Sequence, residues 1–565
     1  MTLASHRIAT ASALVAVLSA CGGGGDDATP VPQLSAATGA TLTSCTDLAT
    51  RATFANTTFT AASAVPAGTL ALAGNSVPAH CLVTGRMFDR VSAVDGKSYA
   101  IGFEMRLPNS WNGRFFYQAN GGTDGSVVTA NSGFGGGATT SPLAQGFAVI
   151  SSDAGHNAAQ NPTFGVDPQA RLDYGYQAVA KLTPMAKNVI QTAYGKAPDR
   201  SYLGGCSNGG RHALVAASRY ADQYDGIISG DPGWRLPLAA TANIAGYQTY
   251  LSLASTPGNA STGFSTAERQ LVSNAVAAKC DALDGATDGL IQDIKACQGA
   301  FDLARDVPTC PGARDGTCLS AQQKTSIAQL FAGATTSTGT KIYSSWPYDT
   351  GLGTNGWSFW KFTVPSILDS GAVGFIWQVP PADPATFNGP NFAATSSIDT
   401  LYANIQATNA TYTENSLSFM TPPHPNDLSA LRSRGAKLMV YHGTSDPIFS
   451  SDDSVAYYEG LRASNGGDAS DFARLYLIPG MNHCSGGPAT DQFDMLTPMV
   501  NWVEHGQAPD SVLASARGAS APGGTNADVP ASWSPTRTRP LCAYPKVARY
   551  NGSGSLDLAS SFTCQ

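Results

Sequence analysis

The chain has few charged residues, no excess of positive charge and no long hydrophobic run beyond its first residues. Asp, Glu, Lys and Arg make up 13% of the 565 residues, against roughly 25% in an average globular protein. The formal net charge is -7, so the chain has no basic field for nucleic acid or other polyanions. No segment after the N-terminus predicts a membrane span, and no internal repeat or heptad pattern is present. These absences favour a small or neutral ligand.

The residues that are abundant favour a large folded protein. Hydrophobic residues make up 42% of the chain, which argues against disorder and allows a sizeable buried core. A length of 565 residues allows a large α/β core together with a second domain or insertion. The 60 glycines and 34 prolines favour long ordered loops over a polar, uncharged surface.

The N-terminus resembles a bacterial export signal. A basic start is followed by the apolar run 8–18 and by Leu-Ser-Ala-Cys, which resembles a lipobox ending at Cys21. The run is too short to remain in a bilayer as a helix. We therefore expect residues 1–21 to be a lipoprotein-type signal peptide with a lipidated Cys21, and residues 22–40 to be a flexible tether. The protein would be periplasmic, anchored to the outer membrane, or secreted. The alternative is an ordinary secretory signal with an incidental cysteine.

The number of cysteines is typical of a disulfide framework. Of the 11 cysteines, ten remain when Cys21 is set aside, and an even number suits an oxidising compartment. Connectivity is not fixed by the sequence. Close spacing favours three pairs, which are Cys280 with Cys297, Cys310 with Cys318, and Cys542 with Cys564. The four that remain are Cys45, Cys81, Cys206 and Cys484.

Short apolar runs that end in turn residues predict the strands of a parallel sheet. In the first half of the chain these runs are 114–117, 147–150, 201–203 and 226–231, and a helical stretch at 210–217 lies among them. Alternation of strands and helices is typical of α/β folds.

The alternation is interrupted by a long insertion. Between about residues 234 and 427 the pattern loosens into Ser, Thr, Gly, Asn and aromatic residues, and strand-like runs resume at 437–441 and 472–478. We therefore expect an α/β catalytic domain made of residues 41–233 and 428–565, with an inserted domain at 234–427. Polar loops at the carboxyl edge of such a sheet carry active sites.

Ser207 is the candidate nucleophile. It is the centre of Gly205-Cys206-Ser207-Asn208-Gly209, a G-x-S-x-G pattern that exposes a serine hydroxyl when it joins a strand to a helix. With 60 glycines in the chain, the pattern arises easily by chance. Here it follows a strand-like run and opens a helix-like one, and this context supports the assignment.

A serine hydroxyl needs a base to take its proton and a carboxylate to orient that base. Asp446 and His483 each follow a predicted strand, and Ser, Asp, His is the chain order of α/β-hydrolases. His483 is favoured because a cysteine adjoins it, as one adjoins Ser207, and a bond between the two would hold base and nucleophile together. The other candidates are His156, His212, His424 and His442 as bases and Asp452 and Asp453 as acids. Asp446 can also be read as a turn residue before Pro447.

The oxyanion of an acyl-transfer intermediate needs hydrogen-bond donors. We expect the backbone amide of Asn208, directly after the nucleophile, and the amides of Gly121 and Gly122, where small residues allow close approach. The alternative for the second pair is a plain glycine turn.

At these residues the chain resembles the tannase and bacterial feruloyl esterase family, which includes hydrolases of mono(2-hydroxyethyl) terephthalate. The adjacent Cys-Ser, the Asp and the His-Cys recur in that family, and the resemblance covers nearly the whole exported chain. It implies an α/β-hydrolase fold with a large inserted lid domain. It also implies the triad Ser207, Asp446 and His483 above a disulfide from Cys206 to Cys484, which leaves Cys45 for Cys81.

A loop in the insertion has the composition of a calcium site. Residues 280–291 contain three aspartates and two glycines in a spacing that is not that of an EF-hand. The pattern is similar to the structural calcium site in the family's lid. This similarity implies ligands from the side chains of Asp281, Asp284 and Asp288 and the carbonyls of Ala286 and Leu290, with a role in lid stability. The alternative is a solvated Asp-Gly turn.

Aromatic residues in the insertion suit an aromatic acyl group, although such clusters are more often core. The resemblance implies substrate contacts from Trp357, Phe375 and Phe449, and His442 is expected near the pocket. One departure concerns the lid arginine that grips the carboxylate in the terephthalate-ester hydrolases. No arginine occurs between Arg314 and Arg432, and the matching position is Gly371. Lys324, Lys341 or Lys361 would replace that arginine only in part.

The sequence therefore predicts an exported serine ester hydrolase that acts on small aromatic esters, of the feruloyl or gallate type, with weak activity on the terephthalate monoester. It predicts calcium and no organic cofactor, and membrane contact only through the lipid anchor. The alternatives are a true terephthalate-monoester hydrolase, a peptidase, and a catalytically silent calcium-dependent surface binding protein on the same fold.

Overall fold

The structure is a computed structural model that describes residues 31–134 and 137–565. The predicted signal peptide, Cys21 and the first part of the predicted tether lie outside these residues. The remaining tether residues, 31–40, were predicted to be flexible, and this prediction is corrected because their backbone is hydrogen-bonded to the folded body. Ala37 N donates to Glu504 Oε2 at 2.8 Å and Thr38 N donates to Asp199 Oδ2 at 2.8 Å. The segment next to the body is therefore ordered by hydrogen bonds.

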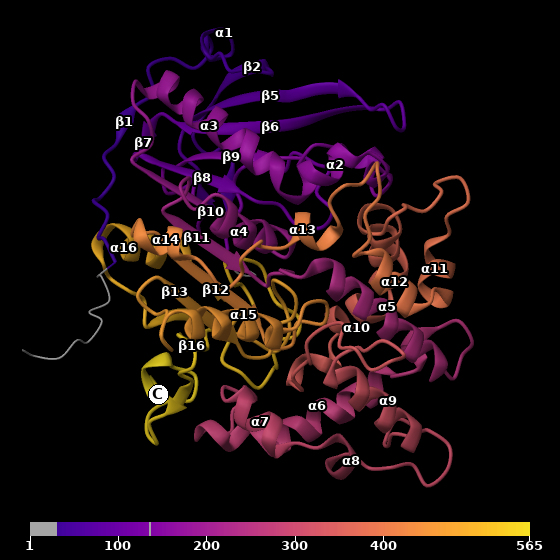
Figure 1. Cartoon of the computed structure of the whole chain (residues 1–565). Coiled ribbons are helices and arrows are strands. Elements are labelled where there is room, and N and C mark those ends of the chain that lie inside the picture. The colour runs from indigo at the N-terminus through magenta and orange to yellow at the C-terminus, as the bar shows by residue number, and fades with distance from the viewer. Residues whose placement is uncertain (1–30, 135–136) are drawn as a thin grey trace, which may run out of the picture.

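A nine-stranded mixed sheet organises the molecule. In sheet order its strands are β13 (Ala473–Ile478), β12 (Lys437–Gly443), β11 (Gly226–Gly230), β10 (Arg200–Cys206), β8 (Arg114–Gln118), β9 (Ala148–Ser152), β6 (Ser98–Pro108), β5 (His80–Val91) and β2 (Thr57–Val65). The strands from β13 to β9 run parallel, whereas β6, β5 and β2 pair antiparallel. Figure 1 shows the antiparallel strands at the top of the view and β12 and β13 below them.

Both faces of the parallel strands are buried, because neighbouring residues of each strand enter different cores. Ile227 packs in one core with α3 (Ala178–Tyr194), α4 (Asn208–Arg219) and α15 (Ser451–Ser464), and Ile228 packs in the other with α16 (Leu496–His505). Strands covered on both faces read as continuous apolar runs. All six strand-like runs and the helical stretch predicted from the sequence are confirmed. The predicted α/β-hydrolase fold is the fold of this chain.

The antiparallel edge was not predicted. Its longest strands alternate buried and more exposed residues, as in β6, where Tyr99, Ile101, Phe103 and Met105 are buried. Such alternation is the signature of a strand with one solvated face. This alternation was present in the sequence. It was not recognised as a strand because the predicted strands were short apolar runs that end in turn residues.

The long segment between β11 and β12 is built from helices and turns. Its α-helices are α5 (Leu236–Ser252), α6 (Thr266–Cys280), α7 (Ile294–Ala300), α8 (Leu303–Asp306), α9 (Ala321–Ala332), α10 (Asn355–Phe362), α11 (Gly389–Thr395), α12 (Ile398–Asn404), α13 (Ser416–Met420) and α14 (Ser429–Ser433). Two π-helical turns, Pro365–Asp369 and Ala372–Trp377, follow α10. Most of the segment lies at the lower right of Figure 1, beside the carboxyl ends of the parallel strands.

The C-terminal segment joins the insertion to the sheet. The strands β14 (Gln492–Phe493), β15 (Ser511–Ser515) and β16 (Thr538–Cys542) form a small antiparallel sheet, and β17 (Ala548–Tyr550) pairs with β18 (Phe562–Cys564). Cys542 and Phe562 share a small core with Ala286 of the predicted calcium loop. That loop therefore lies at a joint between two distant parts of the chain.

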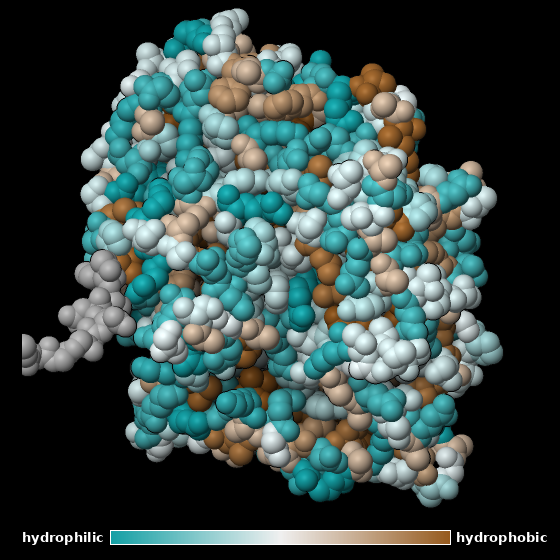
Figure 2. Space-filling view, in the orientation of Figure 1, coloured by the Kyte–Doolittle hydropathy of each residue, from teal (hydrophilic) through white to brown (hydrophobic). Residues whose placement is uncertain are grey.

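The surface matches the low charge of the composition. The face shown in Figure 2 is mostly hydrophilic or neutral, with hydrophobic residues in small scattered groups. Across residues 31–134 and 137–565, no helix has both the length and the apolar character required to cross a bilayer.

The turn from β10 into α4 is tightly packed and requires glycine, which has no side chain. A Cβ added at Gly205 would lie 2.3 Å from the carbonyl oxygen of Ala119 and 2.8 Å from Cα of Gly209. Both neighbours are backbone atoms, so the strand end and the helix would have to move apart. Gly205 is thus required for the close approach of β8, β10 and α4.

We expect Gly205→Ala to lower the free energy of unfolding by about 1–3 kcal/mol, because overpacking displaces backbone. Gly299→Ala is the matched control, because a Cβ at that position in α7 meets nothing within 4 Å and alanine is the better helix former. Chemical unfolding of both purified variants measures the difference. Equal stability of the two variants would contradict the packing argument.

Candidate active site

Ser207 occupies a strained turn between β10 and α4. Its backbone has φ 65 and ψ -126, a conformation that costs energy for any residue with a Cβ. β10 ends at Cys206 and α4 begins at Asn208, so the side chain of Ser207 projects from a sharp strand-to-helix turn. This is the geometry that the G-x-S-x-G pattern predicts.

Three side chains from three segments form one chain of hydrogen bonds. Ser207 Oγ lies 2.8 Å from His483 Nε2, and His483 Nδ1 lies 2.7 Å from Asp446 Oδ2. Asp446 follows β12 and His483 follows β13, so the parallel strands deliver all three groups to the same sheet edge. A hydroxyl, an imidazole and a carboxylate in this order can activate the hydroxyl as a nucleophile.

The disulfide between Cys206 and Cys484 lies beside this chain. The Cα atoms of the two cysteines are 6.1 Å apart although 278 positions separate them. Asp231 Oδ2 is 3.5 Å from the sulfur of Cys206, so the disulfide contacts a buried carboxylate that directly follows β11. All five predicted pairs are bonded, the other four being Cys45–Cys81, Cys280–Cys297, Cys310–Cys318 and Cys542–Cys564.

The carboxylate of Asp446 is held on several sides. Its Oδ1 accepts hydrogen bonds from the backbone amides of Ile448, at 2.9 Å, and Phe449, at 3.1 Å. His442 is fully buried, with Nε2 3.3 Å from Asp446 Oδ2 and Nδ1 2.7 Å from Ser454 Oγ. His442 therefore supports the acid from behind, and it does not line the cavities described below.

Burial and charge shift the pKa values of this cluster in opposite directions. Burial acts to raise the pKa of Asp446, but the charges and hydrogen bonds of His483 and His442 lower it by more. The resulting pKa of Asp446 is well below its usual range. Burial raises the pKa of Asp231, and the charge of Asp446 adds to that rise. Burial alone lowers the pKa of His442, yet Asp446 and Asp231 raise it overall. Asp446 is therefore the ionised member of the two carboxyl groups.

The predicted oxyanion donors lie next to Ser207. A Cβ added at Gly121 would be 3.8 Å from Cβ of Ser207, and Asn208 is the first residue of α4, whose first-turn amides have no partner within the helix. Gly122 lines both cavities that contain Ser207.

A buried polar network fixes this side of the site. Asp124 Oδ2 accepts from Asn208 Nδ2 at 2.9 Å and lies 2.9 Å from His212 Nε2. Burial raises the pKa of Asp124 to about 7. The network ties the glycine loop to α4, which keeps the two sets of donors in register.

Two cavities meet at Ser207. The more enclosed one has about 380 Å³ of space among its lining atoms, part of which opens to solvent. Its described lining is Gly122, Thr123, Tyr174, Ser207, Asn208, Leu236, Trp360, Leu368, Asp369, Ala372, Trp377, Ile448 and Phe449. The open one, about 1120 Å³, also contains Cys206, Trp360, His483 and Cys484. We call the first the inner cavity and the second the outer cavity.

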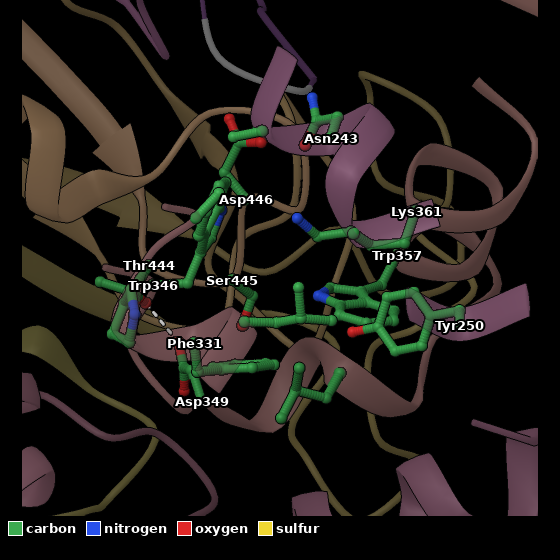
Figure 3. Close-up of a pocket in the computed structure, with 16 residues that line it drawn as sticks. Asn243, Tyr250, Phe331, Trp346, Asp349, Trp357, Lys361, Thr444, Ser445 and Asp446 are labelled. Carbon is green, nitrogen blue, oxygen red and sulfur yellow. Dashed lines mark hydrogen bonds between the residues drawn. The ribbon is translucent and has the colours of Figure 1, made fainter. Parts of the chain in front are cut away.

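A third cavity, about 530 Å³, lies behind Asp446 and holds neither Ser207 nor His483 (Figure 3). Trp357 lines it and packs edge-on against Phe264 and Phe362. The amine of Lys361 points toward Asp446 in Figure 3 and lies 4.0 Å from the ring centre of Trp346. Burial lowers the pKa of Lys361 to about 7.

The aromatic residues at Ser207 differ from those expected. Phe449 lines the inner cavity, as expected, but Trp357 lies in the third cavity and Phe375 packs against Phe387 in the core. Trp360 and Trp377 line the inner cavity instead, and the Trp360 ring meets the His483 ring edge-on at 4.8 Å. Trp357 and Trp360 both lie on α10. Which of the two faces Ser207 depends on how this helix packs, and the sequence alone does not show that.

The remaining candidate bases and acids have other partners. His156 stacks on Phe164, and His212 faces Asp124. Asp452 accepts from Ser345, and Asp453 forms an ion pair with Arg235. The backbone amide of His424 lies 3.4 Å from Ser218 Oγ. None of these contacts involves Ser207.

Comparison with known proteins identifies the family. Residues 81–565 match the family described as tannase and feruloyl esterase. The chain is 40% identical over 535 residues to mono(2-hydroxyethyl) terephthalate hydrolase from Piscinibacter sakaiensis, covering 86% of this chain and 84% of that protein. The chain belongs to the tannase and feruloyl esterase family. Like its relatives, it is a carboxylic ester hydrolase.

Solved structures of the family share the fold. Feruloyl esterase B from Aspergillus oryzae superposes with a TM-score of 0.73 at 24% identity, covering 92% of this chain and 99% of that one. Tannin acyl hydrolase from Aspergillus niger gives a TM-score of 0.66 at 20% identity, with coverages of 92% and 95%. The inserted segment is included in this likeness, because the coverage spans nearly the whole chain.

In this esterase the insertion holds the loops that carry Asp446 and His483. Asp349 accepts from Gly480 N at 3.0 Å and also binds the hydroxyl of Thr444. Thr354 Oγ1 accepts from Asn482 Nδ2 at 2.7 Å. Asn482 precedes His483, so a side chain of the insertion acts directly on the loop of the base.

The predicted calcium loop contains features that fit a cation. Asp284 Oδ2 is buried without a hydrogen-bond partner. Burial raises the pKa of Asp284 to about 7, and the charges of Asp288 and Asp281 add to the effect. Asp288 also forms an ion pair with Arg539 of β16. The free oxygen of Asp284 is the feature that favours a hard cation with oxygen ligands, whereas Asp281 accepts from the amides of Asp288 and Gly289.

Removing the disulfide beside the triad should impair this esterase more than removing a remote one. In Cys206→Ser/Cys484→Ser the loop of His483 loses its covalent link to the nucleophile turn, so we expect kcat to fall at least tenfold and Tm to fall. A small displacement of a catalytic group costs this much. Cys310→Ser/Cys318→Ser, which opens a bond of sequence separation 8, is the control and should keep kcat within about twofold. Equal losses in the two variants would contradict the positional role.

Proposed function

We propose that this chain is an exported serine esterase that hydrolyses esters of aromatic acids through Ser207, His483 and Asp446. The observation that carries the proposal is the continuous hydrogen-bond chain from Ser207 Oγ through His483 to Asp446, with distances of 2.8 and 2.7 Å. The family membership supports the reaction class, and the buried, ionised Asp446 supports the assignment of the acid.

The reaction has two halves. Ser207 Oγ attacks the ester carbonyl while His483 Nε2 takes its proton, and the amides of Asn208 and the glycine loop stabilise the oxyanion. Collapse of the intermediate breaks the bond to the alcohol oxygen, and His483 returns the proton to the leaving alcohol. Water then attacks the acyl-enzyme by the same route and releases the acid. Asp446 orients His483 and stabilises its charged form throughout.

The lining of the inner cavity supports an aromatic acyl group. Trp360, Trp377, Tyr174 and Phe449 surround the space next to Ser207, and flat rings stack favourably on such side chains. The outer cavity is larger and more open, so it suits the alcohol part of the ester. Relatives are named for the terephthalate monoester and for feruloyl esters, and both have aromatic acids.

A terephthalate monoester is the second candidate substrate, because the relative with 40% identity is named for it. The inner cavity argues against efficient turnover. Its described lining contains no arginine, lysine or histidine. A side chain at Gly371, where the family resemblance locates an arginine, would meet Pro162 Cγ at 2.8 Å. Phenolic acids of the feruloyl or gallate type are therefore the preferred class.

We further propose a structural calcium ion in the 281–290 loop. Asp281, Asp284 and Asp288 would supply carboxylate ligands, and Ala286 and Leu290 would supply carbonyls. The ion would neutralise three neighbouring carboxylates at the joint between the insertion and the C-terminal segment. Export and lipidation at Cys21 remain predictions from the N-terminal sequence.

Ser207→Ala should abolish turnover of methyl ferulate, with kcat/KM falling by at least about 10³-fold, because the nucleophile is lost. Rates measured on purified protein decide this, and a fluorophosphonate probe should label Ser207 in the wild-type protein only. Ser464→Ala is the control, since Ser464 is exposed at the end of α15 and lines none of the three cavities. Wild-type turnover by Ser207→Ala would refute the mechanism.

Chelation should lower stability and leave the chemistry in place. We expect EDTA to lower the Tm of the wild-type protein and calcium to restore it, because an ion at 100-fold excess over its Kd stabilises by about 2.7 kcal/mol. In Asp284→Asn the Tm should start lower and no longer respond to calcium, whereas Asp383→Asn, an exposed aspartate of the insertion, should respond as the wild type does. An unchanged wild-type Tm in EDTA would refute the calcium site.

A further inference from the structure

The inner cavity contains polar atoms that no protein group satisfies. Asp369 Oδ2 and Trp377 Nε1 are both buried without a hydrogen-bond partner, and both side chains line the cavity together with Ser207. Buried polar atoms are almost always paired, and leaving one unpaired costs roughly 1–3 kcal/mol. One unpaired acceptor and one unpaired donor in the same small cavity point to a ligand that supplies both.

Asp369 is the only acidic residue in the described lining of this cavity, and no cationic residue accompanies it there. Its side chain is 3% exposed and belongs to the π-helical turn Pro365–Asp369. The groups that act on it are Asn243 from α5 and Lys361 from α10. Lys361 lines the third cavity and is not among the lining residues of the inner one. Asp369 therefore faces a bound acyl group without an intervening cation.

Three substituents on an acyl ring would meet this environment differently. A hydroxyl can donate to Asp369 Oδ2 and can also accept from a donor such as Trp377 Nε1, so it can supply either missing partner. A hydrogen satisfies neither. A carboxylate adds a second negative charge beside a buried acid, which is unfavourable at short range in a region of low dielectric.

We propose that Asp369 is the specificity-determining residue of the inner cavity, that it accepts a hydrogen bond from a hydroxyl on the acyl ring, and that it disfavours rings that carry a carboxylate there. This inference rests on the proposed function, since it assumes that Ser207 acylates from the inner cavity. The missing arginine already favoured phenolic acyl groups over terephthalate. The present inference adds a side chain, Asp369, that would bind the phenolic hydroxyl.

The test compares three methyl esters that differ only at the para position of the acyl ring, which carries a hydroxyl, a hydrogen or a carboxylate. Benzoate and cinnamate series are both made, and the series that the wild type hydrolyses faster is used. The readout is the ratio of kcat/KM values between esters. Wild type and Asp369→Asn are compared with each other, so the intrinsic reactivity of the esters cancels.

We expect the ratio of the hydroxyl ester to the unsubstituted ester to fall at least tenfold in Asp369→Asn, because hydrogen bonds to charged groups are the strong ones. The ratio of the carboxylate ester to the unsubstituted ester should rise in the same variant. Asp383→Asn, at an exposed site in the insertion, should leave both ratios as in the wild type. Unchanged ratios in Asp369→Asn would overturn the inference.

A second measurement uses the pH dependence of the same ratio. Burial raises the pKa of Asp369 to about 7, so the group is neutral below that pH and anionic above it. The carboxylate ester should therefore gain relative to the unsubstituted ester as the pH falls from 8 to 6, while the triad affects both esters equally. The pKa of Lys361 is also about 7, so the same scan is run on Asp369→Asn, where the gain should be lost although Lys361 still titrates. A ratio that stays constant, or a wild type that prefers the carboxylate ester at pH 8, would overturn the inference. Turnover that survives in Ser207→Ala would instead refute the proposed function itself.

Discussion

The bond between Cys206 and Cys484 is the constraint on which the site depends. In the sheet, β11 and β12 lie between β10, which ends at Cys206, and β13, which precedes Cys484. The disulfide therefore crosses the carboxyl ends of two strands and fixes the distance between the strained serine turn and the loop of His483. The acid enters between them from β12. Because a loop of 278 positions is closed, the bond also removes much conformational freedom from the unfolded chain.

The insertion also holds the loops that carry Asp446 and His483 in position. It supplies Asp349 and Thr354, which hold the loops after β12 and β13 by hydrogen bonds. It also supplies Trp360, whose ring contacts the imidazole of His483. In the proposed mechanism, Trp360 lines the cavity for the acyl group and also contacts the base, so a shift of α10 would change both recognition and the position of His483. The insertion is thus part of the catalytic structure as well as a cover over it.

The sequence was informative where local order determines position. The nucleophile turn and the strands of the parallel sheet follow from short patterns, because a buried strand must be apolar and a serine turn needs small neighbours. Close spacing indicated three of the cysteine pairs, whereas the pair Cys206 and Cys484 came from the family resemblance. The antiparallel edge, the docking of residues 33–38 and the choice of Trp360 over Trp357 depend on which surfaces meet after folding. Asp369 had no signal at all, since an aspartate reads as a surface residue until its burial is known.

This division follows the chemistry. Ester hydrolysis demands a fixed geometry of three side chains, and the sheet edge provides it through strands whose order is set by hydrogen bonds. In our proposal, recognition of the acid requires a match between one ring substituent and the inner cavity, which Asp369 and Trp377 of the π-helical turns after α10 line. Replacing a residue in those turns leaves the triad bonds in place. A change of acid specificity would therefore need only side chains of the insertion, because none of them takes part in the bonds among Ser207, His483 and Asp446.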